Sequence, residues 1–452
     1  MLRRLDLRGA GLADLRRRLP RPPSHAGATD GRVRAVLDEV RAGGDAALRR
    51  FAEQFDGVVL DDLAVPPAEV AAALDEIPVD LRRALEAARD NIAAYHAAQV
   101  GVEVVHRNGG VEIRELVRPV DRAGCYVPNA LAPLVSTALM TLVPAKVAGV
   151  PEVVLASPAR PDGRVPPGIL AAAALAGADE VYRVGGPAAI AALAYGTETI
   201  RPVDVIVGPG SARVAQAKRE VAGEGVVGVP SSFAGPSEVV VVADASTPPE
   251  WAAVDVILQA EHGPGGLAWL VSWDEATADA VTAAVARLVP RSPRRQHLEA
   301  TLADGGYAVL CDDPQQALAV ANAIAPEHLE LLVERPGDLV PLVRHAGAVF
   351  CGPLTPASIG DYVAGANHVL PTGGSARFSE ALRVDDFRTH VHVVSVDDEG
   401  LAEVGPHVVA LADHEGLPAH ADSIRLRAAH RPPAGGPAVA GSVVAPSPDG
   451  GP

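Results

Sequence analysis

Apolar positions recur at helical spacing through the first hundred residues of the chain. The repeats over 30–56 and 66–100 each predict a pair of amphipathic helices, and Gly43-Gly44 separates the first pair. Two short strand-like runs follow at 102–106 and 111–118. The early part of the chain is therefore expected to be mainly helical.

The uncharged stretch from Ala123 to Ala145 is long enough to cross a membrane as a helix. It is interrupted by Pro128, Pro133 and Pro144, however, and such punctuation is typical of turns. We interpret the stretch as a turn, a loop and a buried helix.

From residue 151 onward, short β-branched runs alternate with Ala-rich helical runs. This alternation is typical of βαβ units, in which helices connect the strands of a parallel sheet. The predicted strands are 153–157, 180–184, 203–207, 237–243, 268–272, 307–310, 329–333 and 348–351. The predicted helices are 169–176, 188–195, 212–221, 274–287, 314–324 and 337–345.

The pattern predicts the α/β fold class, with two Rossmann-like, doubly wound lobes and small appended segments at the N and C termini. The end of the chain is rich in Pro and Gly, which is typical of disorder. The expected segments are an N-terminal arm (1–28), a first lobe (29–130 with 239–382), a second lobe (131–238), a C-terminal segment of a strand and short helices (383–430) and a disordered tail (431–452).

The composition of the 452 residues is that of a soluble globular protein, with 48% hydrophobic and 21% charged residues. The net charge of -17, from 39 basic and 56 acidic residues, argues against nucleic acid or an anionic membrane as a partner. No signal peptide is evident, and three scattered cysteines favour a reducing cytoplasm over a disulfide framework. Cys125 could be a nucleophile but is better explained as a small buried residue.

Gln259 and His262 end a predicted helix over 252–262, which Gly263-Pro264 terminates. Their spacing of three places both side chains on one helix face, where they could provide half of a metal site. Gln is not a usual zinc ligand, so a polar helix end without chemistry is the alternative.

Glu327 and His328 follow Pro326, a residue suited to the first position of a helical turn. A carboxylic acid beside an imidazole suits general acid–base catalysis, and a surface turn is the alternative. Asp361 and His368 lie in a Gly- and Asn-rich segment and could bind a ligand, although a plain loop has the same composition.

The remaining candidates are less specific. Ser237 stands at the exit of a turn before a predicted strand, while Glu415 and His420 lie in a late helical segment that a solvated helix face also explains. Glycine turns at 185–187 and 208–211 each precede a predicted helix, as at dinucleotide phosphate sites. Neither turn matches G-x-G-x-x-G, so alone they do not identify a cofactor.

In order and spacing, a set of stretches resembles the histidinol dehydrogenase family, zinc- and NAD-dependent enzymes that complete histidine biosynthesis. The resemblance covers roughly residues 30–430. The matching stretches are VRAGGDAALRRFAEQFDGV, NIAAYHAAQ, RPVDRAGCYVP, TLVPAKVAGV, AAIAALAYGTE, VDVIVGPG, AGPSEVVVVAD, ILQAEHGP, PEHLEL, GDYVAGANHVLPT and ARFSEAL.

The resemblance implies that each subunit binds a Zn²⁺ through Gln259, His262, Asp361 and His420. Glu327 and His328 correspond to the catalytic pair, and Tyr126 to a residue that contacts NAD. The residues that the resemblance implies for substrate binding are Ser237, Gln259, His262, His328, Asp361, His368, Glu415 and His420. On this basis the first lobe carries the zinc and catalytic residues, and the second lobe is the cofactor side.

The implied reaction is a four-electron oxidation of L-histidinol to L-histidine through bound histidinal, with reduction of two NAD⁺. His328 would accept the alcohol proton as hydride leaves for NAD⁺, and Glu327 would activate the water that hydrates the aldehyde. The resemblance also implies an intertwined cytoplasmic homodimer, in which the C-terminal segment is exchanged. Glu415 and His420 would then complete the site of the partner subunit.

The cofactor side departs from the family pattern. The family usually has a glycine-rich stretch at Asn129-Ala130-Leu131, Gln at Ala188 and Asn at Ser211. The two missing amides would each make a hydrogen bond worth about 1 kcal/mol. The alternative is therefore a paralogous zinc- and NAD-dependent dehydrogenase that acts on another small polar alcohol. A zinc hydrolase with a water activated by Glu327 is a further alternative, which the matching GPG turn at 208–210 and Tyr126 argue against. A non-catalytic metal-binding or interaction protein is another, which the intact Glu327 and His328 argue against.

Overall fold

The computed structural model describes residues 1–20, 31–129, 133–230, 237–263 and 265–429. They divide into two compact units. The first unit consists of Met1–Gly101 and Pro119–Thr389, and the second of Val102–Arg118 and the chain from His390 onward. The tail predicted over 431–452 lies outside the described residues.

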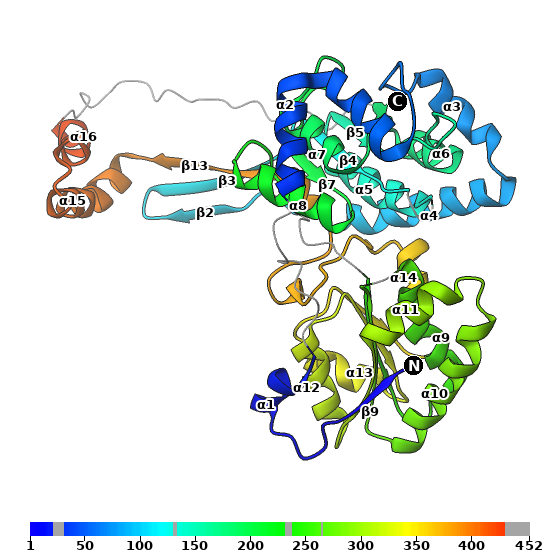
Figure 1. The fold of residues 1–452 in the computed structure, drawn as a ribbon. Coiled ribbons are helices and arrows are strands. Elements are labelled where there is room, and N and C mark those ends of the chain that lie inside the picture. Colours follow the sequence, from blue (N-terminus) through cyan, green and yellow to red (C-terminus); the bar gives the residue numbers. More distant parts are fainter. Residues whose placement is uncertain (21–30, 130–132, 231–236, 264, 430–452) are drawn as a thin grey trace. The chain divides into compact units, whose positions relative to one another are not determined.

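A six-stranded parallel sheet forms one part of the first unit (Figure 1). From β8 the chain adds β9 and β10 on one side and then β11 and β12 on the other, which is a doubly wound topology. The order therefore reverses between β8 and β11. The strands in spatial order are β1 (Arg3–Asp6), β10 (Gly306–Leu310), β9 (Leu267–Ser272), β8 (Glu238–Ala243), β11 (His328–Leu332) and β12 (Ala348–Cys351).

Helices cover both faces of this sheet. Val239 and Val241 of β8 belong to the core on one face, and Val240 and Val242 to the core on the other. Because both faces are buried, the strands are almost continuously apolar. The helices on the first face are α9 (Pro249–Leu258), α10 (Glu275–Leu288) and α11 (Arg295–Gly305), and those on the second are α1 (Leu12–Arg18), α12 (Pro314–Ile324) and α13 (Pro336–Leu339).

A four-stranded parallel sheet forms the other part of the first unit, in the order β6 (Glu180–Tyr182), β5 (Glu152–Ala156), β4 (Arg122–Tyr126) and β7 (Val205–Val207). This sheet is also doubly wound, and its order reverses between β4 and β7. One face packs on α3 (Pro67–Glu76), α4 (Val79–Ala97), α5 (Val135–Val147) and α6 (Pro167–Ala176). The other packs on α2 (Gly31–Phe51), α7 (Gly186–Tyr195) and α8 (Ala212–Gly223).

Short helical segments complete the first unit. They are η1 (Ala52–Asp56), η2 (Gln259–His262), η3 (Val289–Arg291), η4 (Val340–Leu342), α14 (Ala357–Tyr362), η5 (Ser375–Arg377) and η6 (Val384–Phe387). The helix predicted over 337–345 is wrong, because only α13 and η4 form there and Pro341 has no N–H for a continuous helix. The predicted break at Gly43-Gly44 is confirmed as a kink in α2, where Gly44 has a φ of 50°.

The two doubly wound sheets confirm the predicted fold class, but the predicted lobe boundaries differ from the observed packing. Helices α2 to α4 share their cores with the four-stranded sheet, so residues 31–97 group with the second lobe rather than with 239–382. β4 belongs to the same sheet, although its residues were interpreted as a turn. A Cβ at Gly124 would lie 3.1 Å from the Leu193 methyl groups, so glycine permits close packing of α7 at the expense of strand propensity.

The expected N-terminal arm also contributes to a sheet. Residues 3–6 form the edge strand β1, which pairs with β10, and the buried Leu7 follows it. The sequence of β1 is polar because the strand lies at the sheet edge with its side chains largely exposed, so the hydrophobic pattern gave no signal there. Residues 21–30 of the arm are outside the described residues.

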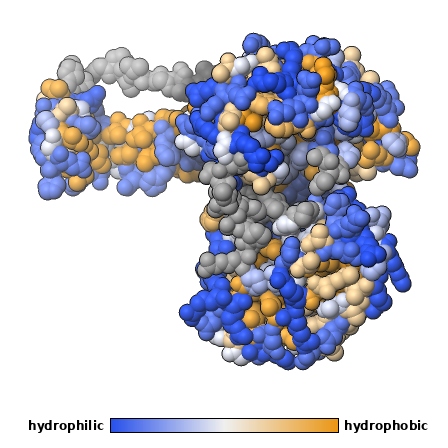
Figure 2. All heavy atoms as spheres, in the orientation of Figure 1, coloured by the Kyte–Doolittle hydropathy of each residue, from blue (hydrophilic) through white to orange (hydrophobic). Residues whose placement is uncertain are grey.

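The second unit contains a three-stranded sheet of β13 (Arg388–Val396), β3 (Val111–Pro119) and β2 (Val105–Asn108), followed by α15 (Asp398–His414) and α16 (Pro418–Ala429). Exposed apolar side chains lie along its sheet and, among hydrophilic ones, on its helices (Figure 2). Val394 of β13 and Leu411 and Leu426 of the helices are each more than 60% exposed. Exposed apolar surface of this kind is typical of protein interfaces. Among the described residues, no helix is both long and apolar enough to span a membrane.

Candidate functional site

The predicted catalytic pair lies at the amino end of β11. His328 is the first residue of the strand, Glu327 precedes it, and both are buried. The expectation of a helical turn after Pro326 is therefore wrong, because this segment enters the middle of the six-stranded sheet. Ser237 immediately precedes β8, the strand next to β11. The candidate site is thus at the amino ends of the two strands between which the strand order reverses.

Asp361 is the centre of this site. It lies in α14, and its Oδ2 accepts a hydrogen bond from Gln259 Nε2 at 3.0 Å. Its Oδ1 is 2.9 Å from Nε2 of His328. Burial alone would raise the pKa of Asp361, but the hydrogen bond and charge of His328 outweigh it and lower that pKa. One carboxylate therefore joins residues from η2, β11 and α14.

The main chain of Glu238 holds both catalytic residues. Its N–H donates to Glu327 Oε2 at 2.9 Å, and its carbonyl accepts a hydrogen bond from Nδ1 of His328 at 3.2 Å. Burial disfavours a charged imidazole, but the carboxylates of Glu327 and Asp361 outweigh burial and raise the pKa of His328 well above its ordinary value. His328 is therefore oriented from both sides, and Nε2 is the ring nitrogen that faces Asp361.

Ser237 and His368 extend the site on either side. The Ser237 hydroxyl is 2.9 Å from Nδ1 of His262. Nδ1 of His368 donates to the Asp361 carbonyl at 2.7 Å, and its Nε2 is 3.0 Å from the Thr137 hydroxyl. Burial lowers the pKa of His368 and so favours the neutral ring. In that ring Nδ1 carries the proton, and Nε2 accepts a hydrogen bond from the Thr137 hydroxyl.

The described residues contain no group of three or more His, Cys, Asp or Glu side chains gathered as a metal centre. Three of the four expected ligands belong to this site: His262, Asp361 and the amide of Gln259. Oε1 of Gln259 is buried and has no hydrogen-bond donor, which is a costly arrangement for an amide oxygen. A cation beside this oxygen and the Asp361 carboxylate would remove that cost, so the donor set fits a bound metal ion.

Glu415 and His420 belong to the second unit. Glu415 follows α15 and His420 lies in α16, and both are exposed. Each was predicted to act in the site of a partner subunit. Their exposure on a separate unit leaves them accessible to a second copy of the chain.

The predicted cofactor residue Tyr126 ends β4 at the carboxyl edge of the four-stranded sheet. Its hydroxyl accepts a hydrogen bond from the Gly186 N–H at 3.1 Å, and burial raises the pKa of Tyr126 to about 12. Gly208 follows β7 with a φ of 104°, and a Cβ there would lie 2.1 Å from the Tyr126 carbonyl oxygen. Both glycine turns therefore converge on Tyr126 at the point where the strand order reverses, the usual ligand position in such sheets.

The departures from the family pattern have simple structural outcomes. Ser211 is the N-cap of α8 and accepts a hydrogen bond from the Val214 N–H. Ala188 is a residue of α7, and its side chain is buried in the core between that helix and the sheet. Asn129 donates to the Pro158 carbonyl, and residues 130 and 131 lie outside the described residues. The small side chain of Ala188 thus serves packing. Cys125 is fully buried and burial raises its pKa to about 12, which confirms its interpretation as a core residue.

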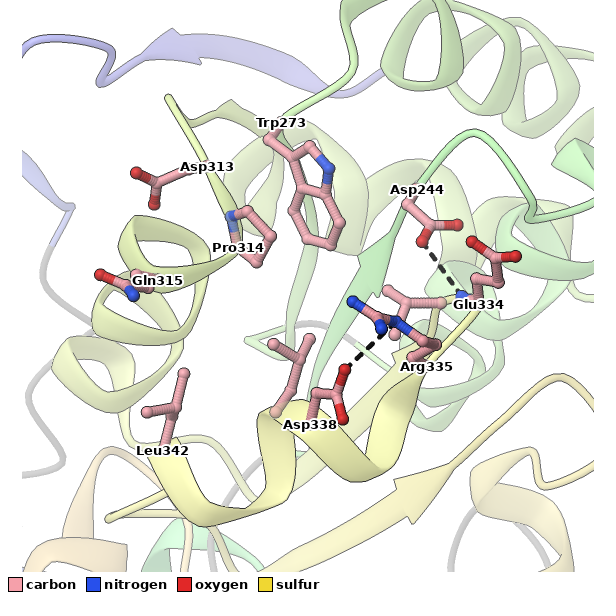
Figure 3. Close-up of a pocket in the computed structure, with 11 residues that line it drawn as sticks. Asp244, Trp273, Asp313, Pro314, Gln315, Glu334, Arg335, Asp338 and Leu342 are labelled. Atoms are coloured by element: carbon pink, nitrogen blue, oxygen red, sulfur yellow. Dashed lines mark hydrogen bonds and ion pairs between the residues drawn. The ribbon is translucent and has the colours of Figure 1, made fainter.

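A hollow of about 500 Å³ lies at the opposite, carboxyl edge of the six-stranded sheet (Figure 3). Its polar groups bind one another: Asp244 accepts the Glu334 N–H at 3.0 Å, and Arg335 pairs with Asp338 at 3.1 Å. None of the candidate residues lines it. In this sheet the candidate chemistry is therefore at the amino edge, away from the usual ligand position.

Several polar residues near the site were not predicted from the sequence. Glu238 and Glu330 are acids inside otherwise apolar strands, and both are buried. Lys218 of α8 is also buried and donates to the Gly208 carbonyl, and burial lowers its pKa to about 7. Glu238 and Glu330 could have been recognised as charged residues within apolar runs, because a buried charge needs a specific partner.

Comparisons with known proteins identify the family of the chain. The histidinol dehydrogenase family profile matches residues 19–428. The histidinol dehydrogenase of Parasynechococcus marenigrum is 46% identical over 401 residues, covering 88% of this chain and 90% of that protein. The enzyme of Rhizobium meliloti is 46% identical over 398 residues, covering 87% and 91%. A crystal structure of histidinol dehydrogenase from Elizabethkingia anophelis superposes with a TM-score of 0.89 at 32% identity, covering 94% and 98% of the two chains.

Proposed function

The chain belongs to the histidinol dehydrogenase family, and from this we propose that it oxidises L-histidinol to L-histidine through bound histidinal, with reduction of two NAD⁺. The observation that carries the proposal is the contact of Asp361 with both His328 and Gln259. This contact supports the proposal because the imidazole proposed as the base lies beside the carboxylate and the amide proposed as metal ligands.

In this proposal, Zn²⁺ is held by Gln259, His262 and Asp361, together with His420 of the partner subunit. A bound Zn²⁺ supplies Lewis-acid polarisation and a template that orients the imidazole and amine of the substrate. The support is the unsatisfied Oε1 of Gln259, which no donor of the described residues reaches. Ser237, His368 and the partner's Glu415 contact the substrate around this centre.

His328 accepts the hydroxyl proton of the alcohol. Nδ1 donates to the Glu238 carbonyl, so the proton is accepted at Nε2, in the neutral ring that would result when a bound cation, rather than the imidazolium, balances the Asp361 carboxylate. Loss of that proton and of a hydride, which NAD⁺ takes up when bound, converts the alcohol to the aldehyde. A base fixed within reach of the proton contributes about 10²–10⁴-fold to such a step.

Glu327 acts in the second oxidation. Its buried carboxylate takes a proton from water, and the hydroxide adds to the aldehyde carbon to give the hydrate as its alkoxide. Loss of a second hydride from this alkoxide, which a second NAD⁺ takes up when bound, gives the carboxylic acid. Glu327 is held for this role by the N–H of Glu238, at 2.9 Å from Oε2.

NAD binds at the carboxyl edge of the four-stranded sheet in this proposal. Tyr126 lies between the turns at Gly186 and Gly208, and the N-terminus of α8 follows the second turn. Helix N-termini of this kind favour the phosphates of a dinucleotide. The Lys218 ammonium beneath the Gly208 turn adds a donor that fixes it.

The first test is NADH formation from L-histidinol by zinc-loaded protein, followed to completion. We expect two NADH for each histidinol, since both oxidations occur in one site. No NADH at saturating NAD⁺ with confirmed zinc occupancy would instead favour the paralogous dehydrogenase, and a panel of other small polar alcohols would then identify its substrate.

We also propose that the protein is a cytoplasmic homodimer, with Glu415 and His420 acting in the partner's site. The exposed apolar surface of the second unit supports an interface, because a monomer would leave Val394, Leu411 and Leu426 in water. The three cysteines are free, which agrees with a reducing compartment.

The exchange of site residues can be tested by mixing two inactive variants, His328→Asn and His420→Ala, after dissociation and reassociation. If His420 acts in the partner's site, each heterodimer contains one fully native site and one site with both changes. We expect activity to return in the mixture, to about a quarter of the native value for random pairing. Mixtures as inactive as the separate variants would show that His420 does not act in the partner's site.

A further inference from the structure

A second layer of buried polar groups lies directly behind Gln259, His328 and Asp361. Asp255 is four residues before Gln259 in α9, and Glu330 is two residues after His328 in β11. Ala357 is four residues before Asp361 in α14. Four residues of a helix and two residues of a strand each advance by about 6 Å and bring the side chain back to the same face. Each member of the second layer therefore lies on the same face of its element as a member of the first layer, about 6 Å further along.

Glu330 connects this second layer. Its Oε1 accepts the N–H of Ala357, the first residue of α14, at 3.0 Å. Asp255 is its neighbouring carboxyl group, and each of the two affects the pKa of the other. Glu330 is 0% exposed and Asp255 is 6% exposed, and both lie on the sheet face that carries the apolar core with α9. The layer therefore joins α9, β11 and α14, the three elements that deliver the first layer.

Two negatively charged carboxylates buried beside each other would repel, so Asp255 and Glu330 can lie together only if they share a proton. Oε2 of Glu330 has no N–H or hydroxyl donor among the described residues, and a proton shared with Asp255 would supply the partner that it lacks. Burial, with the charge of Asp255 as the next cause, raises the pKa of Glu330 to about 9, and burial also raises the pKa of Asp255. His328 is the nearby cationic group, on the same strand. One proton between the two carboxyl groups also removes the repulsion between two buried negative charges.

Fold stability alone does not explain this pair. Well-packed apolar side chains of similar volume are often at least as stable as a buried polar pair, and the rest of this sheet face is apolar. A hydrogen-bonded pair differs from an apolar contact because it permits only one register of the elements that it joins. That register is what places Asp361 against both Gln259 and His328.

We propose that Asp255 and Glu330 are positioning residues, whose paired carboxyl groups, with the Glu330–Ala357 hydrogen bond, hold α9, β11 and α14 in the register that assembles Gln259, His328 and Asp361. Neither residue touches the reacting atoms. They act through the elements that carry the site, one layer further into the core. The catalytic consequence rests on the proposed function, whereas the structural consequence does not.

Two substitutions of Glu330 separate position from stability. Glu330→Gln keeps an oxygen for the Ala357 N–H and an amide that donates to Asp255, so we expect kcat within about threefold of the native value. Glu330→Met has similar length but keeps neither hydrogen bond, and we expect kcat to fall by about 10²-fold, as misplacement of site groups by about 1 Å does. The KM for NAD⁺ is expected to stay within about twofold in both, because the cofactor side is in the other sheet.

The control is Gln316→Met. Gln316 is another buried polar residue, in α12 beside the six-stranded sheet, but it donates to the Leu7 and Ala10 carbonyls, far from the site in the chain. This variant should lower the melting temperature without a change in kcat. If Glu330→Met likewise lowers only the melting temperature, and its folded fraction has a normal kcat, the positioning role is wrong.

Hydrogen exchange tests the layer independently of any substrate. In Glu330→Met the amides of Ala357 and the rest of α14 should exchange at least about tenfold faster, and in Glu330→Gln they should keep their protection. Unchanged protection in Glu330→Met would overturn the proposal. Should that variant not fold, Asp255→Leu breaks the pair from the side of α9 and leaves the Ala357 N–H bound to Glu330, so it is judged by kcat and by faster exchange of the α9 amides. A wild-type protein inactive on histidinol would refute the proposed function and leave the exchange result as the test of the layer.

Discussion

Replacement of His328 by asparagine is expected to lower kcat by about 10²–10⁴-fold. An asparagine amide still donates to the Glu238 carbonyl, which now binds Nδ1, so the start of β11 should remain in place. The amide has no basic nitrogen to replace Nε2, and the alcohol proton then has no fixed acceptor. Steady-state NADH formation, with zinc content and melting temperature determined on the same preparation, measures the effect.

The matched control is His345→Asn, which makes the same chemical change in the same unit. His345 lies outside the candidate site, where its N–H donates to Asn322 Oδ1 at 3.1 Å, so activity should stay native. Glu327→Gln gives a second comparison, because an amide oxygen still accepts the Glu238 N–H but does not take a proton from water. This variant should impair the oxidation of added histidinal most. A His328→Asn protein with kcat within about threefold of native would contradict the assignment of the base.

Removal of the metal is expected to reduce NADH formation to background, with recovery on addition of Zn²⁺. The physical reason is that Gln259 Oε1 and the Asp361 carboxylate then have no cation, and the substrate loses its Lewis acid and its orienting template. Native protein should contain about one zinc per subunit, measured by elemental analysis before and after treatment with a chelator.

Gln259→Leu tests whether the orphaned oxygen is a ligand. The leucine is similar in volume but has no donor atom, so the zinc dissociation constant in a chelator competition should rise by at least about tenfold. Gln316→Leu changes a buried glutamine away from the site and should leave zinc affinity unchanged. Full activity in protein with no detectable zinc, or native zinc affinity in Gln259→Leu, would exclude the proposed metal site.

The sequence alone identified most of the elements of both sheets. Strands such as β8 and β9 are buried on both faces, so they appear as continuous apolar runs that need no knowledge of their neighbours. The failures have local causes. The polar edge strand β1 has no hydrophobic signal, and Gly124 weakens that of β4 because α7 packs closely there.

The candidate residues were identified by their chemistry and by the resemblance to a family, not by their proximity. Gln259, His328 and Asp361 come from three segments, and the contacts that join them span 102 and 33 residues of sequence. The N–H of Glu238 reaches Glu327 across 89 residues. No periodicity within a segment encodes such contacts, because they depend on which strands are neighbours.

The amino-acid sequence thus determined the α/β class, the position of most helices and strands and the residue types available for chemistry, because these depend on local burial patterns. Only the tertiary structure decided that Glu327 and His328 enter a buried strand, that the candidate site occupies the amino edge of the six-stranded sheet, and that Glu330 lies behind it with Asp255. These features follow from the pairing of β8 with β11 and the packing of α9 and α14, which bring distant segments together.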